Sequence, residues 1–214
     1  MLRAFLFALL CFSAAHAADG PLKIIVFGDS ITEGKTPAVL KPAERWIERV
    51  QASSGGKWVC VNEGKGGRPA SAVNELAPAL KRSPDASVLV IALGTNDSRD
   101  YPAGSVERLS ANMTKLIEIA RTANPKLQII LCAPYNINID GLKHDQDKSA
   151  RRVENLVAFG KAIEKLSAEK KCGFINFYGV IPPGSLTTDG VHPDAAGHAA
   201  IAEVAEKGLK EILK

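Results

Sequence analysis

The stretch that decides the fold is Leu22-Lys23-Ile24-Ile25-Val26-Phe27, which runs directly into Gly28-Asp29-Ser30. Its apolar and β-branched residues are typical of a buried β-strand. The glycine then turns the chain, so that Ser30 presents a hydroxyl at the carboxyl end of the strand. In alternating α/β proteins, ligands bind at this end of the strands. Ser30 is therefore the first candidate for a functional residue.

Four more apolar runs follow, and segments with helical spacing separate them. The five predicted strands are 23–27, 57–61, 87–93, 127–133 and 173–177. The third run is almost continuously apolar, as expected for a strand that is covered on both faces. This alternation predicts an α/β fold in which a five-stranded parallel sheet lies between two layers of helices. The long polar connection 135–149 is predicted to be a loop.

The first 17 residues have the pattern of a secretory signal peptide. Arg3 supplies a positive charge, an apolar run follows it, and Ala15-His16-Ala17 fits the small-residue cleavage site. The run is shorter than the roughly 20 apolar residues that a membrane anchor needs. We therefore expect export to the periplasm or the medium and a single domain over residues 18–214. No stable membrane insertion is expected after the signal is removed.

Charge and cysteine content argue against several classes of protein. The 27 basic residues of the chain are spread out rather than clustered, which argues against a nucleic-acid partner. The cysteines beyond the signal are Cys60, Cys132 and Cys172, and this odd number argues against a complete disulfide framework, although one disulfide remains possible. The spacing of the cysteines does not match a zinc-binding pattern, and His144 is the only histidine in its charged loop. Both are weak signals for a metal site, so we expect neither a metal nor another cofactor.

Four polar clusters stand out. Three follow the first three predicted strands directly, and the fourth lies between the fifth strand and the last helical segment. The carboxyl ends of parallel strands share one edge of a sheet, so these clusters are expected to converge there although they are far apart in sequence. The clusters are Gly28-Asp29-Ser30, the segment 62–67, Gly94-Thr95-Asn96-Asp97 and Asp189-Gly190-Val191-His192.

These clusters contain the groups that acyl transfer needs. Ser30 is a weak nucleophile without a base, and the imidazole of His192 can accept its proton. Asp189 can orient that imidazole and stabilise its charged form. An oxyanion could be met by the backbone N–H groups of Ser30 and Gly67 and by the side-chain amide of Asn96. Taken singly, each residue is also a common helix cap, turn or surface residue, and His198 in the last helical segment is expected at the helix surface.

Two other serine or glycine motifs fit less well. A phosphate-binding P-loop has four residues between its glycines, whereas five separate Gly28 from Gly34, and Pro37 follows where the helix should begin. The nucleophile elbow of α/β-hydrolases needs G-x-S-x-G, and Thr32 stands in place of the second glycine. Both alternatives are therefore disfavoured.

The four clusters, in this order, resemble the motif blocks of SGNH-type (GDSL-like) esterases and lipases over nearly the whole mature chain. The resemblance implies a three-layer, flavodoxin-like α/β/α fold, no metal, and hydrolysis of esters or thioesters. It assigns the nucleophile to Ser30, the oxyanion donors to Gly67 and Asn96, and the acid–base pair to Asp189 and His192.

The pocket wall is less certain, because Arg68-Pro69 follows Gly67 where relatives often carry small polar residues. We expect Arg68 and Arg99 to be solvated surface charges. The polar loops and the aromatic content of 6% favour a short acyl group, above all acetyl, on a sugar or another polar alcohol. Thioesterases and lysophospholipases that act on longer acyl chains are the main alternative, and a non-catalytic carbohydrate-binding module on the same fold is a more distant one. The expected partner is a small-molecule or glycan ester, and the sequence does not indicate an oligomeric state.

Overall fold

The structure is a computed structural model that describes residues 20–34, 40–99, 104–142 and 146–214. The predicted signal peptide, residues 1–17, and His144 lie outside these ranges. Within the described residues, no helix has the length and apolarity needed to cross a membrane. The same residues contain no group of three or more His, Cys, Asp or Glu placed to hold a metal ion.

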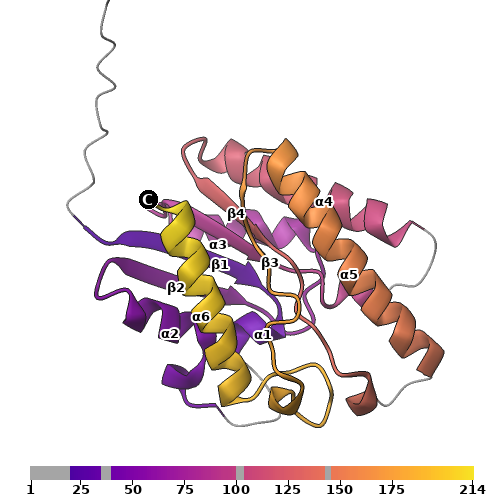
Figure 1. Ribbon diagram of the computed structural model, residues 1–214. Helices are drawn as coiled ribbons and strands as arrows, with labels where there is room; N and C mark the ends of the chain where they lie inside the picture. Colours follow the sequence, from indigo (N-terminus) through magenta and orange to yellow (C-terminus); the bar gives the residue numbers. More distant parts are fainter. Residues whose placement is uncertain (1–19, 35–39, 100–103, 143–145) are drawn as a thin grey trace, which may run out of the picture.

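Five parallel strands form one sheet in the order β2-β1-β3-β4-β5, with β1 flanked by β2 and β3 (Figure 1). Gly28, the last residue of β1, pairs with Gly64 of β2 and with Ala92 of β3, so the three strands end at the same edge. The predicted parallel sheet is confirmed, although β5 ends two residues earlier than expected. The strands are β1 Leu22–Gly28, β2 Trp58–Gly64, β3 Val88–Ala92, β4 Gln128–Cys132 and β5 Gly173–Ile175.

Helices cover both faces of this sheet, which gives the expected three layers (Figure 1). In β1, Ile25 and Phe27 pack toward α3, α4 and α5, whereas Ile24 and Val26 pack toward α2 and α6. This alternation follows from the two-residue period of a strand. The α-helices are α1 Ser30–Glu33, α2 Trp46–Ser53, α3 Leu76–Arg82, α4 Ser105–Ala123, α5 Gln146–Glu169 and α6 Ala195–Ile212. Short 3₁₀ turns are η1 Pro42–Glu44, η2 Val73–Glu75, η3 Asp97–Arg99, η4 Ile139–Gly141 and η5 Pro183–Ser185.

The connection 135–149 is a loop, as predicted, in its described part up to Leu142, apart from the short turn η4, but it differs from the prediction at both ends. Its first residue, Tyr135, is buried, and its ring stacks on Phe177 with 5.1 Å between ring centres. Trp46 of α2 packs edge-on against the same Phe177. Tyr135 therefore belongs to the same apolar cluster as Trp46 and Phe177. At the other end, helix α5 already begins at Gln146.

Cys60, Cys132 and Cys172 are free thiols, so none of the possible disulfides among them is formed. Cys132 is buried within β4, and burial raises the pKa of its thiol far above the ordinary value. Burial, followed by the nearby Glu48 carboxylate, raises the pKa of Cys60 to about 12. These thiols therefore behave as small apolar side chains.

Candidate active site

Ser30 is the first residue of the short helix α1, directly after the end of β1. Asp29 caps this helix, because its Oδ1 accepts a hydrogen bond from the N–H of Ile31 at 3.0 Å. The turn between strand and helix is so tight that a Cβ on Gly28 would lie 2.0 Å from Thr32 Oγ1. Only glycine can occupy that position, and the turn leaves the Ser30 side chain half-buried at the rim of the sheet.

The structure brings Ser30, His192 and Asp189 into one line of contacts. The Oγ of Ser30 lies 2.7 Å from Nε2 of His192. The Nδ1 of the same ring lies 2.7 Å from Oδ2 of Asp189. Residues 162 positions apart in sequence thus meet at hydrogen-bonding distance, as the convergence of strand ends predicts.

The Asp189 carboxylate organises the turn that carries His192. Its Oδ1 accepts hydrogen bonds from the N–H groups of Val191 and His192, each at 2.9 Å, and from the Thr187 hydroxyl at 3.0 Å. Burial by itself would raise the pKa of Asp189, but the bonds from the His192 backbone and ring and from Val191 outweigh it. The pKa of Asp189 therefore falls to about 2, and the group is ionised at neutral pH.

Gly190 locks this turn against the segment that follows β4. Its φ is +70°, and a Cβ there would lie 2.2 Å from the carbonyl oxygen of Asn138. The Asn138 N–H donates to the Gly190 carbonyl at 2.8 Å, and the Thr187 N–H donates to the His192 carbonyl at 2.8 Å. The imidazole of His192 is consequently held on a rigid turn.

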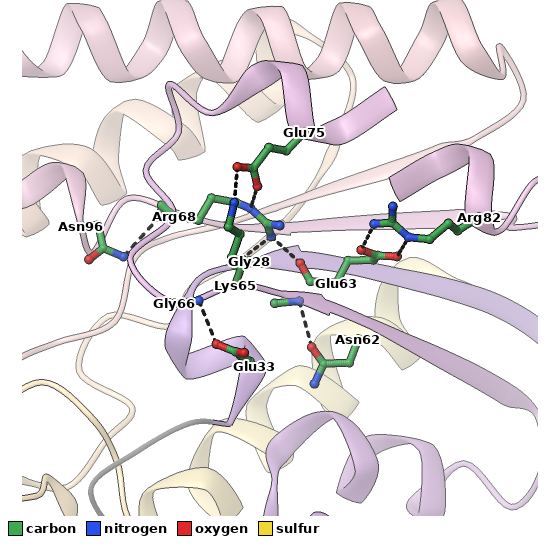
Figure 2. Close-up of polar contacts among 11 residues, drawn as sticks. Gly28, Glu33, Asn62, Glu63, Lys65, Gly66, Arg68, Glu75, Arg82 and Asn96 are labelled. Atoms are coloured by element: carbon green, nitrogen blue, oxygen red, sulfur yellow. Dashed lines mark hydrogen bonds and ion pairs between the residues drawn. The ribbon is translucent and has the colours of Figure 1, made fainter. Parts of the chain in front are cut away.

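The predicted oxyanion donors lie on the loops after β2 and β3. The Asn96 amide Nδ2 donates to the Arg68 carbonyl at 3.3 Å, which Figure 2 shows, and to Asp29 Oδ2 at 3.4 Å. Gly67 is exposed in the loop after β2, with a φ of +72°. Its neighbour Gly66 donates its N–H to Glu33 Oε2 at 2.8 Å, which ties this loop to the helix that begins with Ser30.

Asp29 is a buried carboxylate beside the site. Its sequence position alone did not mark it as a candidate for a functional role. It is 1% exposed, and burial raises its pKa to about 6. The His192 ring lowers the pKa of Asp29 and the Asp97 carboxylate raises it, so both groups lie within electrostatic reach. Its position before a helix-starting serine is a common signal for a helix cap, and this signal could have drawn attention to it.

Two expectations about charged side chains were wrong. Arg68 is not a surface charge: it is 6% exposed, and its guanidinium donates to main-chain carbonyls and a carboxylate (Figure 2). Arg99 is exposed, as expected. His198 is not on the helix surface: it is fully buried, and its Nδ1 accepts the N–H of Trp46 at 3.2 Å.

The environment of His198 follows from the packing of α6 on α2. Burial, and then the charges of Arg49 and Arg45, lower its pKa to about 4. The burial of His198 could have been predicted from the sequence, because it shares a helical face with Ile201 and Ala205, which are core residues.

A cleft of about 230 Å³ opens beside His192. It lies between the 3₁₀ turn η3, the turn η4 and the 189–192 turn. Leu142 and Val191 contribute apolar surface, and Arg99 contributes a charge. The cleft therefore offers room for a small group next to the imidazole.

The sequence matches the model of the GDSL-like lipase/acylhydrolase family over residues 26–200. The chain therefore belongs to this family, which confirms the resemblance drawn from the four motif blocks. Membership also confirms the expected class of enzyme, a carboxylic ester hydrolase. No sequence among the curated proteins matches the chain.

Several solved structures share the fold, and in each of the three named here the match covers 89% of this chain and 99% of the other. A protein provisionally named as an arylesterase from Agrobacterium tumefaciens strain C58 is 26% identical, with a TM-score of 0.77. Est24, a carbohydrate acetylesterase from Sinorhizobium meliloti, is 19% identical, with a TM-score of 0.76. The aryl esterase of M. smegmatis is 18% identical, with a TM-score of 0.75.

Proposed function

We propose that this chain is an exported serine ester hydrolase that removes short acyl groups, above all acetyl, from carbohydrates or other polar alcohols. The observation that carries the proposal is the line of contacts from Ser30 Oγ through the His192 ring to Asp189, with both distances at 2.7 Å. Family membership supports the reaction class. The name of Est24 as a carbohydrate acetylesterase supports the substrate class by analogy.

In the first half of the reaction, Ser30 Oγ attacks the ester carbonyl carbon while Nε2 of His192 takes the hydroxyl proton. The carbonyl π electrons move to oxygen and form a tetrahedral oxyanion. The oxyanion then collapses, the C–O bond to the alcohol breaks, and Nε2 gives its proton to the departing alcohol oxygen. The acyl group is left on Ser30. A water molecule repeats the sequence and releases the carboxylic acid.

Asp189 sets the tautomer of the imidazole in this scheme. The carboxylate accepts the Nδ1 proton of His192, so Nε2 is left as the acceptor for Ser30. Because its pKa is about 2, Asp189 remains an anion throughout and stabilises the imidazolium that forms when Ser30 is deprotonated.

Three donors would receive the oxyanion: the N–H groups of Ser30 and Gly67 and the amide of Asn96. The N–H of Ser30 is at the start of helix α1, where backbone donors have no partner within the helix. The two hydrogen bonds of the Asn96 amide are long, at 3.3 and 3.4 Å, so little is lost when the amide turns to the substrate.

The cleft of about 230 Å³ lies on the Asp189 side of His192 and offers room for a small part of the substrate there. The apolar side chains of Leu142 and Val191 in the same cleft favour the second candidate, a thioesterase or lysophospholipase that acts on longer acyl chains. A series of p-nitrophenyl esters separates the two, because the acetylesterase should prefer C2–C4 chains and the second candidate C10 or longer. Acetylated xylan and an O-acetylated sialic acid, run beside the series, test the carbohydrate acceptor.

The reaction itself is tested with p-nitrophenyl acetate and a serine-directed organophosphonate. The unaltered protein should turn over the ester and carry one adduct on Ser30 by mass spectrometry. Ser30→Ala should lose the adduct and about 10⁴-fold or more of kcat. Ser71→Ala, which alters an exposed serine, is the control and should behave like the parent. No turnover and no adduct in the parent protein would favour the non-catalytic carbohydrate-binding module.

Export is tested separately by expressing the full chain in a bacterial host and sequencing the amino terminus of the periplasmic or secreted product. We expect the mature protein to begin at Ala18. An uncleaved product that stays in the cytoplasm would contradict the predicted signal peptide.

A further inference from the structure

We propose that Arg68 is a positioning residue for the oxyanion site, because its buried guanidinium holds the Gly67 loop against the end of β1. The proposal rests on the function proposed above, since it assigns a role within the same site. It goes beyond that function in naming a residue that touches neither the serine nor the imidazole.

The guanidinium of Arg68 binds the ends of two strands at once (Figure 2). Its Nη1 donates to the Gly28 carbonyl at 2.6 Å and also to the Glu63 carbonyl. Its Nε donates to Glu75 Oε2 at 2.9 Å. The guanidinium carbon lies 4.1 Å from the centre of the Phe27 ring, which is a cation–π contact.

These contacts lie where β1 and β2 separate. The two strands pair in register as far as Gly28 and Gly64, and beyond this pair one chain enters α1 and the other enters the loop. The carbonyls of Gly28 and Glu63, where the two strands separate, need hydrogen-bond donors, because an unpaired buried carbonyl is energetically costly. Lys65 N–H supplies one donor to Gly28 at 3.1 Å, and the Arg68 side chain supplies the others. Arg68 therefore fastens the loop to the strand that leads to Ser30.

Gly67 depends on its neighbours for its position. A Cβ built on Gly67 would meet no atom within 4 Å, so the space on the side-chain face of this residue is open. On one side, Gly66 is bound to Glu33. On the other side, Arg68 N–H donates to the Lys65 carbonyl at 3.2 Å, and its side chain is anchored in the core. The direction of the Gly67 N–H is set between these two anchors.

The main chain of Arg68 also reaches the second predicted donor, because its carbonyl accepts the Asn96 amide at 3.3 Å. A single buried residue thus adjoins Gly67 in sequence and contacts Asn96 in space. Displacement of Arg68 would move the Gly67 N–H away from the position that the oxyanion must occupy, and it would change the resting contact of the Asn96 amide. Rates are sensitive to such shifts, since a misplacement of about 1 Å can cost roughly 10²-fold.

The chemistry of this anchor requires arginine rather than lysine. The planar guanidinium forms several hydrogen bonds in fixed directions and stacks on an aromatic ring, whereas an ammonium is a compact point charge. Its buried charge is balanced by Glu75, whose pKa is lowered by the bond from Lys65 and then by Arg68, so that the carboxylate is ionised.

The test compares Arg68→Met and Arg68→Lys with Arg82→Met. Arg82 binds the Glu63 side chain of β2, and among the described residues its side-chain hydrogen bonds reach only this carboxylate, so it is a matched control. The readouts are kcat and KM for p-nitrophenyl acetate at 25 °C, with active enzyme counted by phosphonate titration, and the melting temperature. We expect Arg68→Met to lose about 10- to 100-fold of kcat with KM nearly unchanged, and Arg68→Lys about 10-fold. Arg82→Met should retain kcat within about two-fold, since surface ion pairs contribute little.

A lowered melting temperature with an unchanged kcat in either Arg68 variant would show that the residue only stabilises the fold, and would overturn the proposal. If Arg68→Met does not fold, Arg68→Lys decides, because it keeps the charge but lacks the two separate nitrogens in a fixed plane with which Arg68 reaches Gly28 and Glu75. A parent protein without turnover and without a Ser30 adduct would refute the proposed function instead, so the two failures are distinguishable.

Discussion

The two halves of the candidate site are built in different ways. The acid–base half occupies four consecutive residues, and one carboxylate, Asp189, holds both the turn and the imidazole of His192. The proposed oxyanion half is assembled from separate loops, in which contacts of Arg68, Asp29 and Asp97 link the segments that carry Gly67 and Asn96. Most bonds of the first half lie within the turn, with a further bond from the Asn138 N–H to the Gly190 carbonyl, whereas the second half depends on contacts between separate loops. Changes in the first half should therefore act locally, and changes in the second half should spread.

The largest effect is expected at Asp189, where substitution by Asn tests the acid–base half. The Oδ1 of Asn can still accept the bonds from Val191 and His192 that form the turn. Its amide, however, would donate to Nδ1 and place the ring proton on Nε2, which leaves no acceptor for Ser30. We expect kcat for p-nitrophenyl acetate to fall about 10⁴-fold, with only a small decrease in melting temperature from the loss of the carboxylate charge.

Asp194→Asn is the control, because Asp194 caps α6 and Asn caps helices equally well. A kcat near that of the parent in Asp189→Asn would contradict the role of Asp189 in setting the tautomer.

Asn96→Ala tests the oxyanion half of the site. It removes one donor to the oxyanion, and we expect kcat to fall about 10²- to 10³-fold, or roughly 2.7–4 kcal/mol, with KM nearly unchanged. Asn74→Ala alters an exposed asparagine and should leave both parameters as in the parent. If the change appears in KM alone, Asn96 binds the substrate equally in the ground state and the transition state, and it is not an oxyanion donor.

A buried ionisable group lies near each half of the site: His198 near the acid–base half and Asp29 near the oxyanion half. Their contributions to the unfolding free energy should change with pH in opposite directions. Behind the acid–base half, burial and two arginines lower the pKa of His198 from 6.5 to about 4. The unfolded chain then binds the proton more readily, so stability is lost as the pH falls from about 6.5 to about 4. This difference in pKa is equivalent to about 3 kcal/mol. His198→Asn, in which Oδ1 can replace Nδ1 as the acceptor for Trp46, should remove that loss.

Urea unfolding of the parent and of His198→Asn at pH 7 and pH 4.5 measures the effect. Equal losses of unfolding free energy in the two proteins would show that His198 does not titrate in this way.

Behind the oxyanion half, burial raises the pKa of Asp29 from 3.8 to about 6. The folded protein holds the proton more tightly, so this carboxyl destabilises the fold above pH 6, and the penalty disappears as the pH falls from about 6 to about 4. Asp29→Asn keeps the bond to Ile31 and should raise the unfolding free energy at pH 7 by about 1–3 kcal/mol. The same urea experiment measures it, and a less stable variant at pH 7 would contradict the assignment.

Candidate residues for both halves were named from the sequence, but only contacts that are short in sequence, or that follow from the shared sheet edge, could be predicted. The strand before Gly28 and the Asp189–His192 turn follow from local patterns, and the shared edge of a parallel sheet predicts that they meet. The burial of Arg68 could not be predicted in this way, because its partner Gly28 is 40 residues earlier and the register of β1 and β2 decides the contact. The burial of His198 was predictable from its helical face, but the nearby Asp194 suggested a surface position instead.

The three free thiols bear on how the chain would respond to an oxidising environment. Thiol–disulfide exchange proceeds through the thiolate. Burial raises the pKa of Cys60, Cys132 and Cys172, so each spends very little time in the reactive form at neutral pH. Folding would then need no oxidase or isomerase to pair cysteines. Activity should be indifferent to dithiothreitol or to glutathione of either oxidation state.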